Sequence, residues 1–413
     1  MVIEKMKIVH INASDVGGGA AIASKRHAEA MRQAGIDSCV LVAYSSSHSK
    51  VVCKPHWGWR SLLQLYYSAK RIKLNKKLSP IGTFSVMQDG MPLYDNAFIR
   101  KADVIFLHWI NNETLSLKGV KKILDFGKPT FWYMHDMFPI TGGCHHALDC
   151  QGYKTDCKDC PLIQNSSCKK VAEKQLKKKI KTLSQYKNLS FVTPSIWLGN
   201  CVENSALAIN HKVFVVPNVI NTNIYKPINM DAKSMFGLDP QKKTILFGVA
   251  NRKSVYKGAE YAHECLKRLD PSKYEGLIIG NTNEDFINDI PMRIVETGYL
   301  GDDISLCMAY NACDTFIITS MAENYPNVVL EAMSCGKPCV GFRTGGIPDL
   351  IHHKTTGYLT EEKTVDELLQ GIEWLFEDSI RYQTLSESAR KQILENNSYE
   401  RVLDIHKELS GLL

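Results

Sequence analysis

Short apolar runs alternate with amphipathic stretches along most of the chain. Runs of this kind, rich in β-branched and aromatic residues, predict buried strands. In the first half of the chain they fall at 7–12, 38–44, 103–109, 129–135, 190–195 and 213–218. The stretch 20–35 has a helical pattern and ends at Gly35, a residue type that suits a helix terminus. Strands that alternate with helices in this way predict a parallel sheet covered by helices on both faces.

A second series of the same kind begins after a polar stretch that suits a domain linker. Its strands are predicted at 244–250, 276–280 and 314–320, with a helix at 258–269. With 413 residues and 44% hydrophobic content, the chain is long enough for two domains of ordinary size. The sequence therefore predicts an α/β protein with domains at 1–222 and 223–385. We expect the charged, mostly helical tail at 386–413 to pack back towards the N-terminal domain.

The segment SMAENYPNVVLEAMSCGKPCVGF at 320–342 combines a polar loop, a helix of about ten residues and a buried strand. Pro326 suits the first helical position and Gly336 the residue just past the helix end. Glu331 falls among apolar residues of the helix, where a buried carboxylate needs hydrogen-bond donors. Glu323 precedes the helix, whose N-terminus attracts anions. Alternatively, Glu323 caps the helix and Glu331 pairs with a neighbouring Lys or Arg.

Two loops carry groups that suit a phosphate. Gly17, Gly18 and Gly19 lie between the first strand and the first helix, where backbone N–H groups can approach a phosphate closely. The spacing is not G-x-G-x-x-G, and the second strand ends in VAYSSS without an acidic residue, which disfavours a dinucleotide dehydrogenase. Arg252 and Lys257 follow the first strand of the second domain and would face a pocket between the domains. The alternatives are a tight turn that binds nothing and two solvated surface charges.

Five of the thirteen cysteines lie in one loop, 141–168, and four of them are clustered at 141–163. Cys144, Cys150, Cys157 and Cys160 have the spacing C-x5-C-x6-C-x2-C, and the last pair has the two-residue spacing of a zinc knuckle. Cys168, His145 and His146 could each replace one ligand. We therefore weigh a structural zinc ion against reduced cysteines without metal, a redox disulfide and an iron–sulfur cluster.

The net charge of +7 is modest, and we expect no nucleic-acid partner. Much of the excess lies in two basic segments, 69–78 and 169–183, and the first follows the aromatic and aliphatic run at 56–68. Such helices either lie on an anionic membrane surface or present solvated faces. No apolar run approaches the roughly 18 residues of a spanning helix, and the N-terminus has no signal-peptide pattern. We expect a cytoplasmic protein at the inner face of the plasma membrane.

Several motifs occur together in an order that resembles the retaining glycosyltransferases of family 4. They are AENYPNVVLEA with its E-x7-E spacing, GGIPDLI at 345–351 followed by TGYL at 356–359, VPNVINTNIYKP, and the Arg252/Lys257 pair before Gly258. The resemblance covers nearly the whole chain, is strongest in the second domain and extends to bacterial exopolysaccharide and capsule enzymes. It implies the GT-B fold, in which two Rossmann-like, doubly wound parallel-sheet domains face a central cleft.

The resemblance also implies roles for individual residues. Glu331 would accept hydrogen bonds from the ribose of a nucleotide-sugar donor, and Glu323 would contact hydroxyls of the transferred sugar. Arg252 and Lys257 would neutralise the pyrophosphate in place of a divalent metal, so that catalysis requires no cofactor. Backbone amides of the loop would line the sugar and phosphate site, although proline lacks a donor. The donor-binding residues are Gly17, Gly18, Gly19, Asn324, Tyr325, Pro326, Asn327, Val328 and Glu331.

In the first domain, His135 matches the histidine that approaches the donor sugar in the family, and the alternative is a core histidine at a strand end. Asp136 and His108 are acceptor-side candidates. No carboxylate is an obvious nucleophile, so the resemblance favours same-face attack with retention.

We expect a UDP- or GDP-linked sugar as the donor. The expected acceptor is a glycan or a lipid-linked sugar of cell-surface polysaccharide synthesis. The alternatives are a GT-B nucleotide-sugar 2-epimerase and a non-catalytic sugar- or metal-binding subunit.

Overall fold

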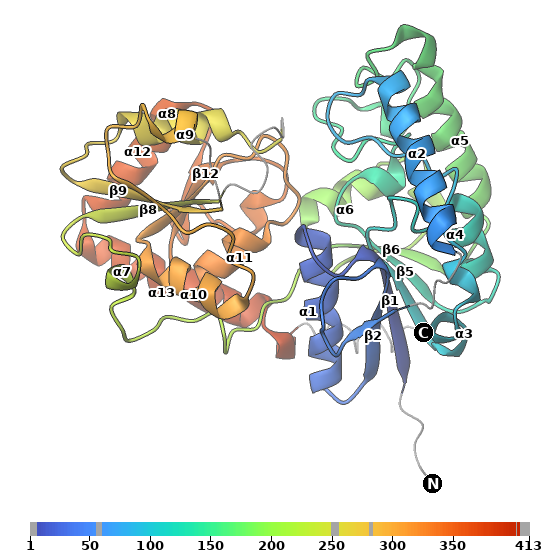
Figure 1. The fold of residues 1–413 in the computed structure, drawn as a ribbon, viewed down its shortest axis with the longest axis horizontal. Coiled ribbons are helices and arrows are strands. Elements are labelled where there is room, and N and C mark those ends of the chain that lie inside the picture. The colour runs from blue at the N-terminus through green and yellow to red at the C-terminus, as the bar shows by residue number, and fades with distance from the viewer. Residues whose placement is uncertain (1–5, 55–59, 249–255, 281–283, 402, 405–413) are drawn as a thin grey trace. The chain divides into compact units, whose positions relative to one another are not determined.

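The computed structural model describes residues 6–54, 60–248, 256–280, 284–401 and 403–404. The chain divides into two compact units (Figure 1). One is Met1–Val219 with Leu403–Leu413, and the other is Ile220–Val402. The change of unit thus falls between Val219 and Ile220, three residues before the predicted boundary.

Seven parallel strands form the sheet of the first unit within the described residues. Their order is β3-β2-β1-β4-β5-β6-β7. The strands are β1 (Lys7–Ser14), β2 (Asp37–Tyr44), β3 (Val52–Cys53), β4 (Val104–Leu107), β5 (Thr130–Tyr133), β6 (Leu189–Thr193) and β7 (Val213–Val215). The helices are α1 (Gly19–Gln33), α2 (Arg60–Leu78), α3 (Ala97–Lys101), α4 (Leu117–Leu124), α5 (Lys170–Leu183) and α6 (Ile196–Glu203). The predicted strands of this half are all present, and only the short β3 was not predicted.

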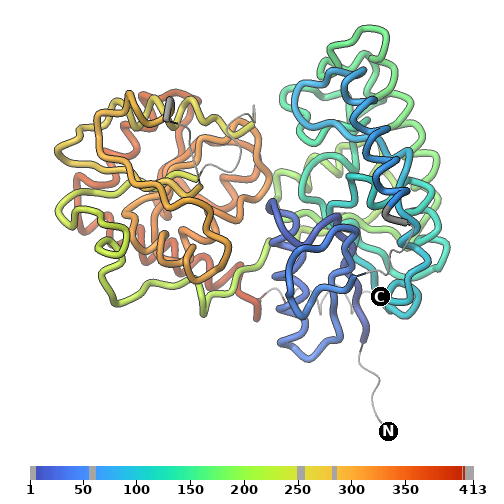
Figure 2. The backbone as a smooth tube through the Cα atoms, in the orientation of Figure 1, coloured from blue at the N-terminus to red at the C-terminus, as the bar shows by residue number. Residues whose placement is uncertain are grey.

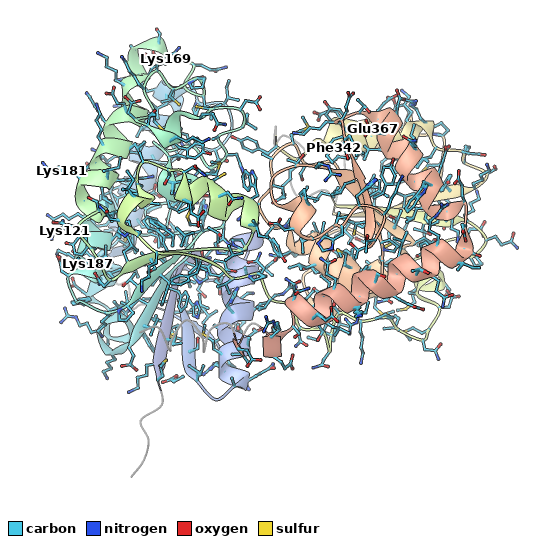
Figure 3. The ribbon with its side chains drawn as sticks, turned by 180° about the vertical axis from the view of Figure 1, so that it is seen from behind. Lys121, Lys169, Lys181, Lys187, Phe342 and Glu367 are labelled. Carbon is cyan, nitrogen blue, oxygen red and sulfur yellow. The ribbon has the colours of Figure 1, made fainter. Side chains whose placement is uncertain are left out.

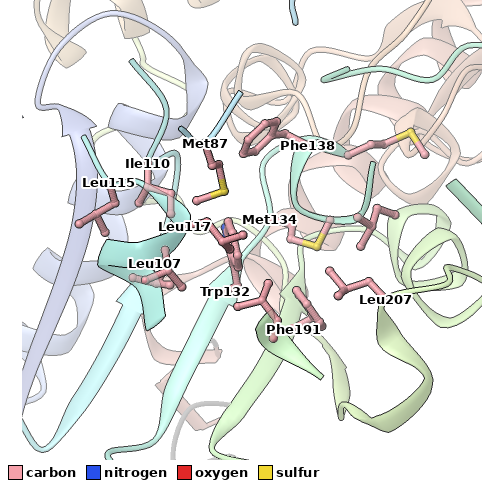
Figure 4. Close-up of a cluster of buried hydrophobic side chains, with 14 of the residues drawn as sticks. Met87, Leu107, Ile110, Leu115, Leu117, Trp132, Met134, Phe138, Phe191 and Leu207 are labelled. Carbon is pink, nitrogen blue, oxygen red and sulfur yellow. The ribbon is translucent and has the colours of Figure 1, made fainter. Parts of the chain in front are cut away.

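One face of this sheet packs an aliphatic and aromatic core. Leu107, Trp132 and Phe191, from three neighbouring strands, lie in one cluster with Met87 and Phe138 (Figure 4). Trp132 is 1% exposed and Phe191 is fully buried. Because side chains alternate along a strand, the neighbours of these residues face the other side of the sheet.

Helix α5 differs from its prediction in one residue. Lys179 lies in the basic segment 169–183, whose charges are expected at a membrane surface or in solvent, yet it is 1% exposed. Its Nζ donates hydrogen bonds to the carbonyl oxygens of Phe138 (2.5 Å) and Thr141 (2.9 Å). Burial lowers the pKa of Lys179 to about 7. Four other lysines of this helix are exposed, namely Lys174, Lys177, Lys178 and Lys181, and Lys181 points outward in Figure 3.

The second unit has six parallel strands within its described residues, in the order β10-β9-β8-β11-β12-β13. They are β8 (Lys243–Gly248), β9 (Tyr274–Ile279), β10 (Ile294–Glu296), β11 (Thr315–Ile318), β12 (Cys339–Phe342) and β13 (Gly357–Thr360). The helices are α7 (Ala232–Met235), α8 (Ala259–Arg268), α9 (Glu284–Ile287), α10 (Asp303–Ala312), α11 (Asn327–Ser334), α12 (Val365–Phe376) and α13 (Ser379–Asn396). Helices α8 and α12 lie on one face of the sheet and α10, α11 and α13 on the other (Figure 2).

Helix α13 packs into the second unit. Ala389 and Ile393 are fully buried in the core of the second unit. Nη1 of Arg390 donates hydrogen bonds to the carbonyl oxygens of Tyr225 and Ser334, both at 2.7 Å. The segment from residue 386 to the end of α13 therefore belongs to the second unit, whereas Leu403–Leu413 is grouped with the first unit.

Candidate functional site

The predicted donor-site residues of the second unit gather at the point where its strand order reverses. Strands β8 and β11 are neighbours, and the chain continues outward from each of them in opposite directions. The loops after both strands leave the sheet at its carboxyl edge. Ligands of open α/β sheets bind at such a switch point.

Lys257 and Glu323 form an ion pair in these loops. Nζ of Lys257 lies 2.6 Å from Oε2 of Glu323, and the hydroxyl of Ser320 lies 3.4 Å from the same oxygen. The side chain of Lys257 is 48% exposed and that of Glu323 is 15% exposed. The two predicted site residues are thus brought into contact, and Lys257 is not a solvated charge without a partner. Arg252 lies outside the described residues.

Two glycines allow the loops to approach each other. A Cβ atom on Gly258 (φ +58°) would lie 2.1 Å from the carbonyl oxygen of Thr319, and one on Gly345 (φ +54°) would lie 1.9 Å from that of Glu323. The Thr319 hydroxyl also donates to the Gly258 carbonyl at 2.8 Å. These contacts fix the backbone on which Lys257 and Glu323 stand.

Glu331 is buried inside α11 with a phenol partner. The residue is 3% exposed, and its carboxylate accepts a hydrogen bond from the hydroxyl of Tyr310 on α10 at 2.8 Å. Burial, together with the negative charge of Glu331, raises the pKa of Tyr310, which therefore acts as a neutral donor. The sequence analysis considered a Lys or Arg partner for Glu331 and did not predict this tyrosine.

The loop before α11 presents backbone rather than side chains. Asn324, Tyr325 and Asn327 are buried, and the Tyr325 hydroxyl accepts a hydrogen bond from Nδ2 of Asn397 at 3.0 Å. Pro326 precedes the helix as its N-cap, one position earlier than predicted, and Val328 is 37% exposed. Backbone N–H groups in a first helical turn have no acceptor within the helix, so this turn is suited to an anion.

The glycine-rich loop of the first unit is open on its outer side. Gly17 and Gly18 have φ values of +75° and +92°, no atom lies within 4 Å of a Cβ built on either, and Gly19 begins α1. Asp15, which was not predicted, anchors the loop because its carboxylate accepts hydrogen bonds from Ser45, Ser46 and Ser47. Burial raises the pKa of Asp15, but these hydrogen bonds outweigh it and lower the pKa to about 2. The serines after β2 thus hold the loop.

Three histidines join across the first sheet. Nδ1 of His10 lies 2.8 Å from Nε2 of His108, and Nδ1 of His108 lies 2.9 Å from Nε2 of His135. His10 and His108 are 1% and 2% exposed, whereas His135 is partly exposed. Burial lowers the pKa of His135 to about 4, although Asp136 raises it in part. His135 and His108 are therefore in contact, and His10 is a member that the sequence did not reveal.

Asp136 is held by protein groups. Its carboxylate accepts hydrogen bonds from Nδ1 of His145 (2.6 Å), Nε1 of Trp109 (3.0 Å) and the backbone N–H of Phe138 (2.9 Å). Burial raises its pKa, and His145 and the other donors lower it by more, so that the net shift is downward. A carboxylate of this kind is a poor general base, and it orders the start of the cysteine-rich loop.

The four clustered cysteines line one small cavity. Cys144, Cys150, Cys157 and Cys160 all border it. Backbone N–H groups of Gly142 and Gly152 lie 3.3 Å and 3.4 Å from the sulfurs of Cys157 and Cys150. All thirteen cysteines are free thiols, and in the described part of the chain no group of three or more His, Cys, Asp or Glu is arranged to hold a metal ion. The structural zinc ion stays a prediction, which metal analysis of the purified protein tests.

Comparisons with known proteins agree with this geometry. Residues 231–392 match the model of the family described as glycosyl transferases group 1. The chain is 23% identical over 416 residues to the putative colanic acid biosynthesis glycosyl transferase WcaC of Escherichia coli, which covers 94% of this chain and 95% of that protein. It is 25% identical over 208 residues to the N-acetyl-alpha-D-glucosaminyl L-malate synthase of Bacillus anthracis. That match covers 48% of this chain and 54% of the relative, and so spans about half of the relative's length.

Solved structures share the two-unit architecture. HepE of Anabaena, crystallised with UDP and glucose, superposes with a TM-score of 0.66 at 19% identity. The superposition covers 98% of this chain and 99% of that one. The fold is therefore GT-B, as the motifs implied. The chain resembles the group 1 glycosyltransferases of bacterial polysaccharide synthesis.

Proposed function

We propose that the protein is a retaining glycosyltransferase of family 4. It moves a sugar from a UDP- or GDP-linked donor to a glycan or lipid-linked acceptor in cell-surface polysaccharide synthesis. The observation that carries the proposal is the Lys257–Glu323 pair at the switch point of the second sheet, directly before the helix that contains Glu331. The group 1 match spans the same residues.

The pair suits a ligand that carries both a diphosphate and hydroxyl groups. When the diphosphate binds near the N-terminus of α11, the ammonium of Lys257 turns from Glu323 to the phosphate, whose charge is greater. Glu323 then accepts hydrogen bonds from hydroxyls of the transferred sugar. Glu331, already oriented by Tyr310, accepts from the ribose. As the bond to the sugar breaks, Lys257 stabilises the departing diphosphate, and the departing oxygen takes the proton of the acceptor hydroxyl on the same face.

Thermal shift against UDP, GDP and their common sugars tests the donor class. A ligand that binds only the folded state raises the melting temperature, by an amount that grows with its ratio to Kd. We expect a shift with one nucleotide that Lys257→Ala reduces. Lys267→Ala is the matched control, because Lys267 is an exposed lysine of the same unit paired with Asp289 at 2.8 Å. Equal shifts in both variants would overturn the assignment of Lys257.

Turnover separates the transferase from its alternatives. A transferase releases nucleoside diphosphate in the presence of an acceptor, and the anomeric configuration of the product reports retention. A 2-epimerase exchanges the hydrogen at C2 of the sugar instead. A non-catalytic subunit would bind the nucleotide sugar and do neither.

Helix α2 supports a second proposal, peripheral contact with an anionic membrane. Its outer face exposes Leu62, Leu65, Tyr66 and Ile72 by 69%, 68%, 59% and 63%. These residues are spaced as one helical stripe, and exposed lysines follow at 73, 76 and 77. An apolar stripe next to basic residues suits the interface of an anionic bilayer. A lipid-linked acceptor would be found at such a surface.

Among the described residues, no helix is both long and apolar enough to cross a membrane. Co-sedimentation with vesicles of phosphatidylglycerol and phosphatidylcholine tests the surface contact. We expect Leu65→Ser with Ile72→Ser to reduce binding about tenfold or more, because each side chain contributes about 1.5–3 kcal/mol when fully buried. Ile304→Ser with Ile380→Ser is the control, since these isoleucines of the second unit are 70% and 77% exposed. Equal binding by both double variants would contradict the proposal.

A further inference from the structure

Beneath α1, the first sheet presents a face built from rings. His10 of β1 stacks on Phe106 of β4 with centroids 4.9 Å apart. His108, which follows β4, stacks on both Tyr133 and His135 with centroids 5.2 Å apart. These positions alternate with those of the aliphatic core on the opposite face. The ring face therefore carries His10, His108 and His135.

The three histidines run from the interior to the partly exposed His135. At the inner end, Nε2 of His10 lies 3.4 Å from the sulfur of Met31 on α1. The hydroxyl of Ser38 also donates towards this sulfur, at 3.7 Å. A thioether accepts hydrogen bonds and has no proton to donate. Met31 therefore determines which nitrogen donates in each hydrogen bond between the histidines.

The direction follows ring by ring, because a neutral imidazole carries one N–H and one acceptor nitrogen. His10 donates from Nε2 to Met31, so its Nδ1 is an acceptor. His108 must then donate from Nε2 to His10, which leaves its own Nδ1 as the acceptor. His135 in turn donates from Nε2 to His108. The remaining nitrogen of His135, Nδ1, keeps its lone pair.

The opposite direction is disfavoured by the same contacts. It would turn the lone pair of His10 Nε2 towards the lone pairs of the sulfur, in a position that is 1% exposed. Two acceptors that face each other at 3.4 Å repel and form no hydrogen bond. The pKa of about 4 for His135 keeps this ring neutral near pH 7, as the chain requires.

We propose that Met31, His10 and His108 hold His135 in the tautomer that presents Nδ1 as a hydrogen-bond acceptor. His135 thus receives a hydrogen bond from a hydroxyl of the donor sugar and does not give one. His10 and His108 are positioning residues, since they act through His135. The inference rests on the proposed function only for the identity of the ligand.

The tautomer can be measured without any activity. Long-range ¹H–¹⁵N correlation on the full chain labelled with ¹⁵N-histidine distinguishes protonated from unprotonated ring nitrogens. The chain has thirteen histidines, and the signals absent from His135→Gln identify His135. We expect Nε2 to be protonated and Nδ1 unprotonated in the wild type. A proton on Nδ1 of His135 would overturn the inference.

Three variants separate the direction of the chain from simple packing. His108→Phe keeps a stacked ring but removes the acceptor for His135, whereas His108→Asn keeps an acceptor oxygen close to the place of Nδ1. Met31→Leu removes the sulfur at the far end with little change in volume. We expect His108→Phe and Met31→Leu to mix the tautomers of His135 and to lower kcat/KM about tenfold, and His108→Asn to stay within about threefold of the wild type.

His211→Phe is the control for replacing a histidine in the same unit, because its Nδ1 contacts the Leu189 carbonyl outside the chain of histidines. We expect it to leave both readouts unchanged. If His108→Asn and His108→Phe lowered kcat/KM equally and left the His135 tautomer unchanged, the histidines would contribute only packing. That result would overturn the inference. If the wild type transfers no sugar at all, the proposed function fails, and the NMR result alone decides on the tautomer.

Discussion

At the scale of single residues, each unit orients a polar side chain of the candidate site through a hydrogen bond to a buried side chain. The Tyr310 phenol helps to orient Glu331, and His10 and His108 orient His135. In both cases the partner is buried. A group held in this way needs no reorganisation when a ligand binds.

The Tyr310–Glu331 hydrogen bond can be removed by Tyr310→Phe, which keeps the ring. Because the acceptor is a charged carboxylate, we expect the free energy of unfolding to fall by about 1.5–3 kcal/mol and nucleotide affinity to fall as Glu331 loses its orientation. Denaturant unfolding and calorimetry with the bound nucleotide measure the two effects. Tyr382→Phe also removes a hydrogen bond, to the Asp314 carbonyl at 2.8 Å, and should lower stability alone. An unchanged nucleotide affinity in Tyr310→Phe would contradict the assignment of Glu331 to the ribose.

His135 makes a prediction about acid stability. Its pKa is lowered from 6.5 to about 4, so between these values the unfolded chain binds a proton that the folded chain does not. Stability is therefore lost as the pH falls through this window, by up to roughly 3 kcal/mol. The pKa of Asp136 is lowered from 3.8, so Asp136 changes the pH dependence of stability only below about that pH. Unfolding at a series of pH values should show a shallower slope in His135→Gln, and parallel slopes would contradict the assignment.

At the scale of elements, periodicity predicted more than residue type did. The strands around the site follow from their apolar runs, and Gly336 (φ +71°) ends α11 as its position suggests. The expectation for Lys179 was wrong because it followed the charge of the residue and not its position on the helix. Lys179 lies three residues after Leu176 and four before Leu183, and therefore on the same buried face as these two leucines. The partners Tyr310 and Met31 could not be predicted, because they lie on other helices and contacts between distant segments leave no local pattern.

Gly345 tests whether the loop before α11 depends on close backbone approach. In Gly345→Ala the new Cβ would meet the Glu323 carbonyl, and φ is positive besides. We expect a loss of about 2 kcal/mol or more in stability and loss of nucleotide binding, as the loop is displaced. Gly237→Ala is the matched control, with φ +63° and its nearest contact a flexible arginine at 3.7 Å. It should lose only about 1–2 kcal/mol and keep binding. Comparable binding in both variants would show that the loop tolerates displacement.

At the scale of the whole molecule, each unit has its own sheet, core and switch point. The second unit contains Lys257, Glu323, Glu331 and the N-terminus of α11, all on a scaffold with its own buried clusters. The first unit contains His135 and the glycine-rich loop. If this division is functional, nucleotide recognition and sugar positioning reside in different units.

Residues 220–402 expressed alone test that division. Because this unit has its own hydrophobic core, we expect it to fold and to bind the nucleotide with a Kd within about tenfold of the full chain, a difference of about 1.4 kcal/mol. It should transfer no sugar, because His135 is absent. Lys257→Ala in the same fragment should weaken binding, which ties the signal to the described site. A folded fragment that does not bind would mean that the first unit supplies recognition of the nucleotide as well as of the sugar, and the glycine-rich loop at 17–19 would then be the first place to seek it.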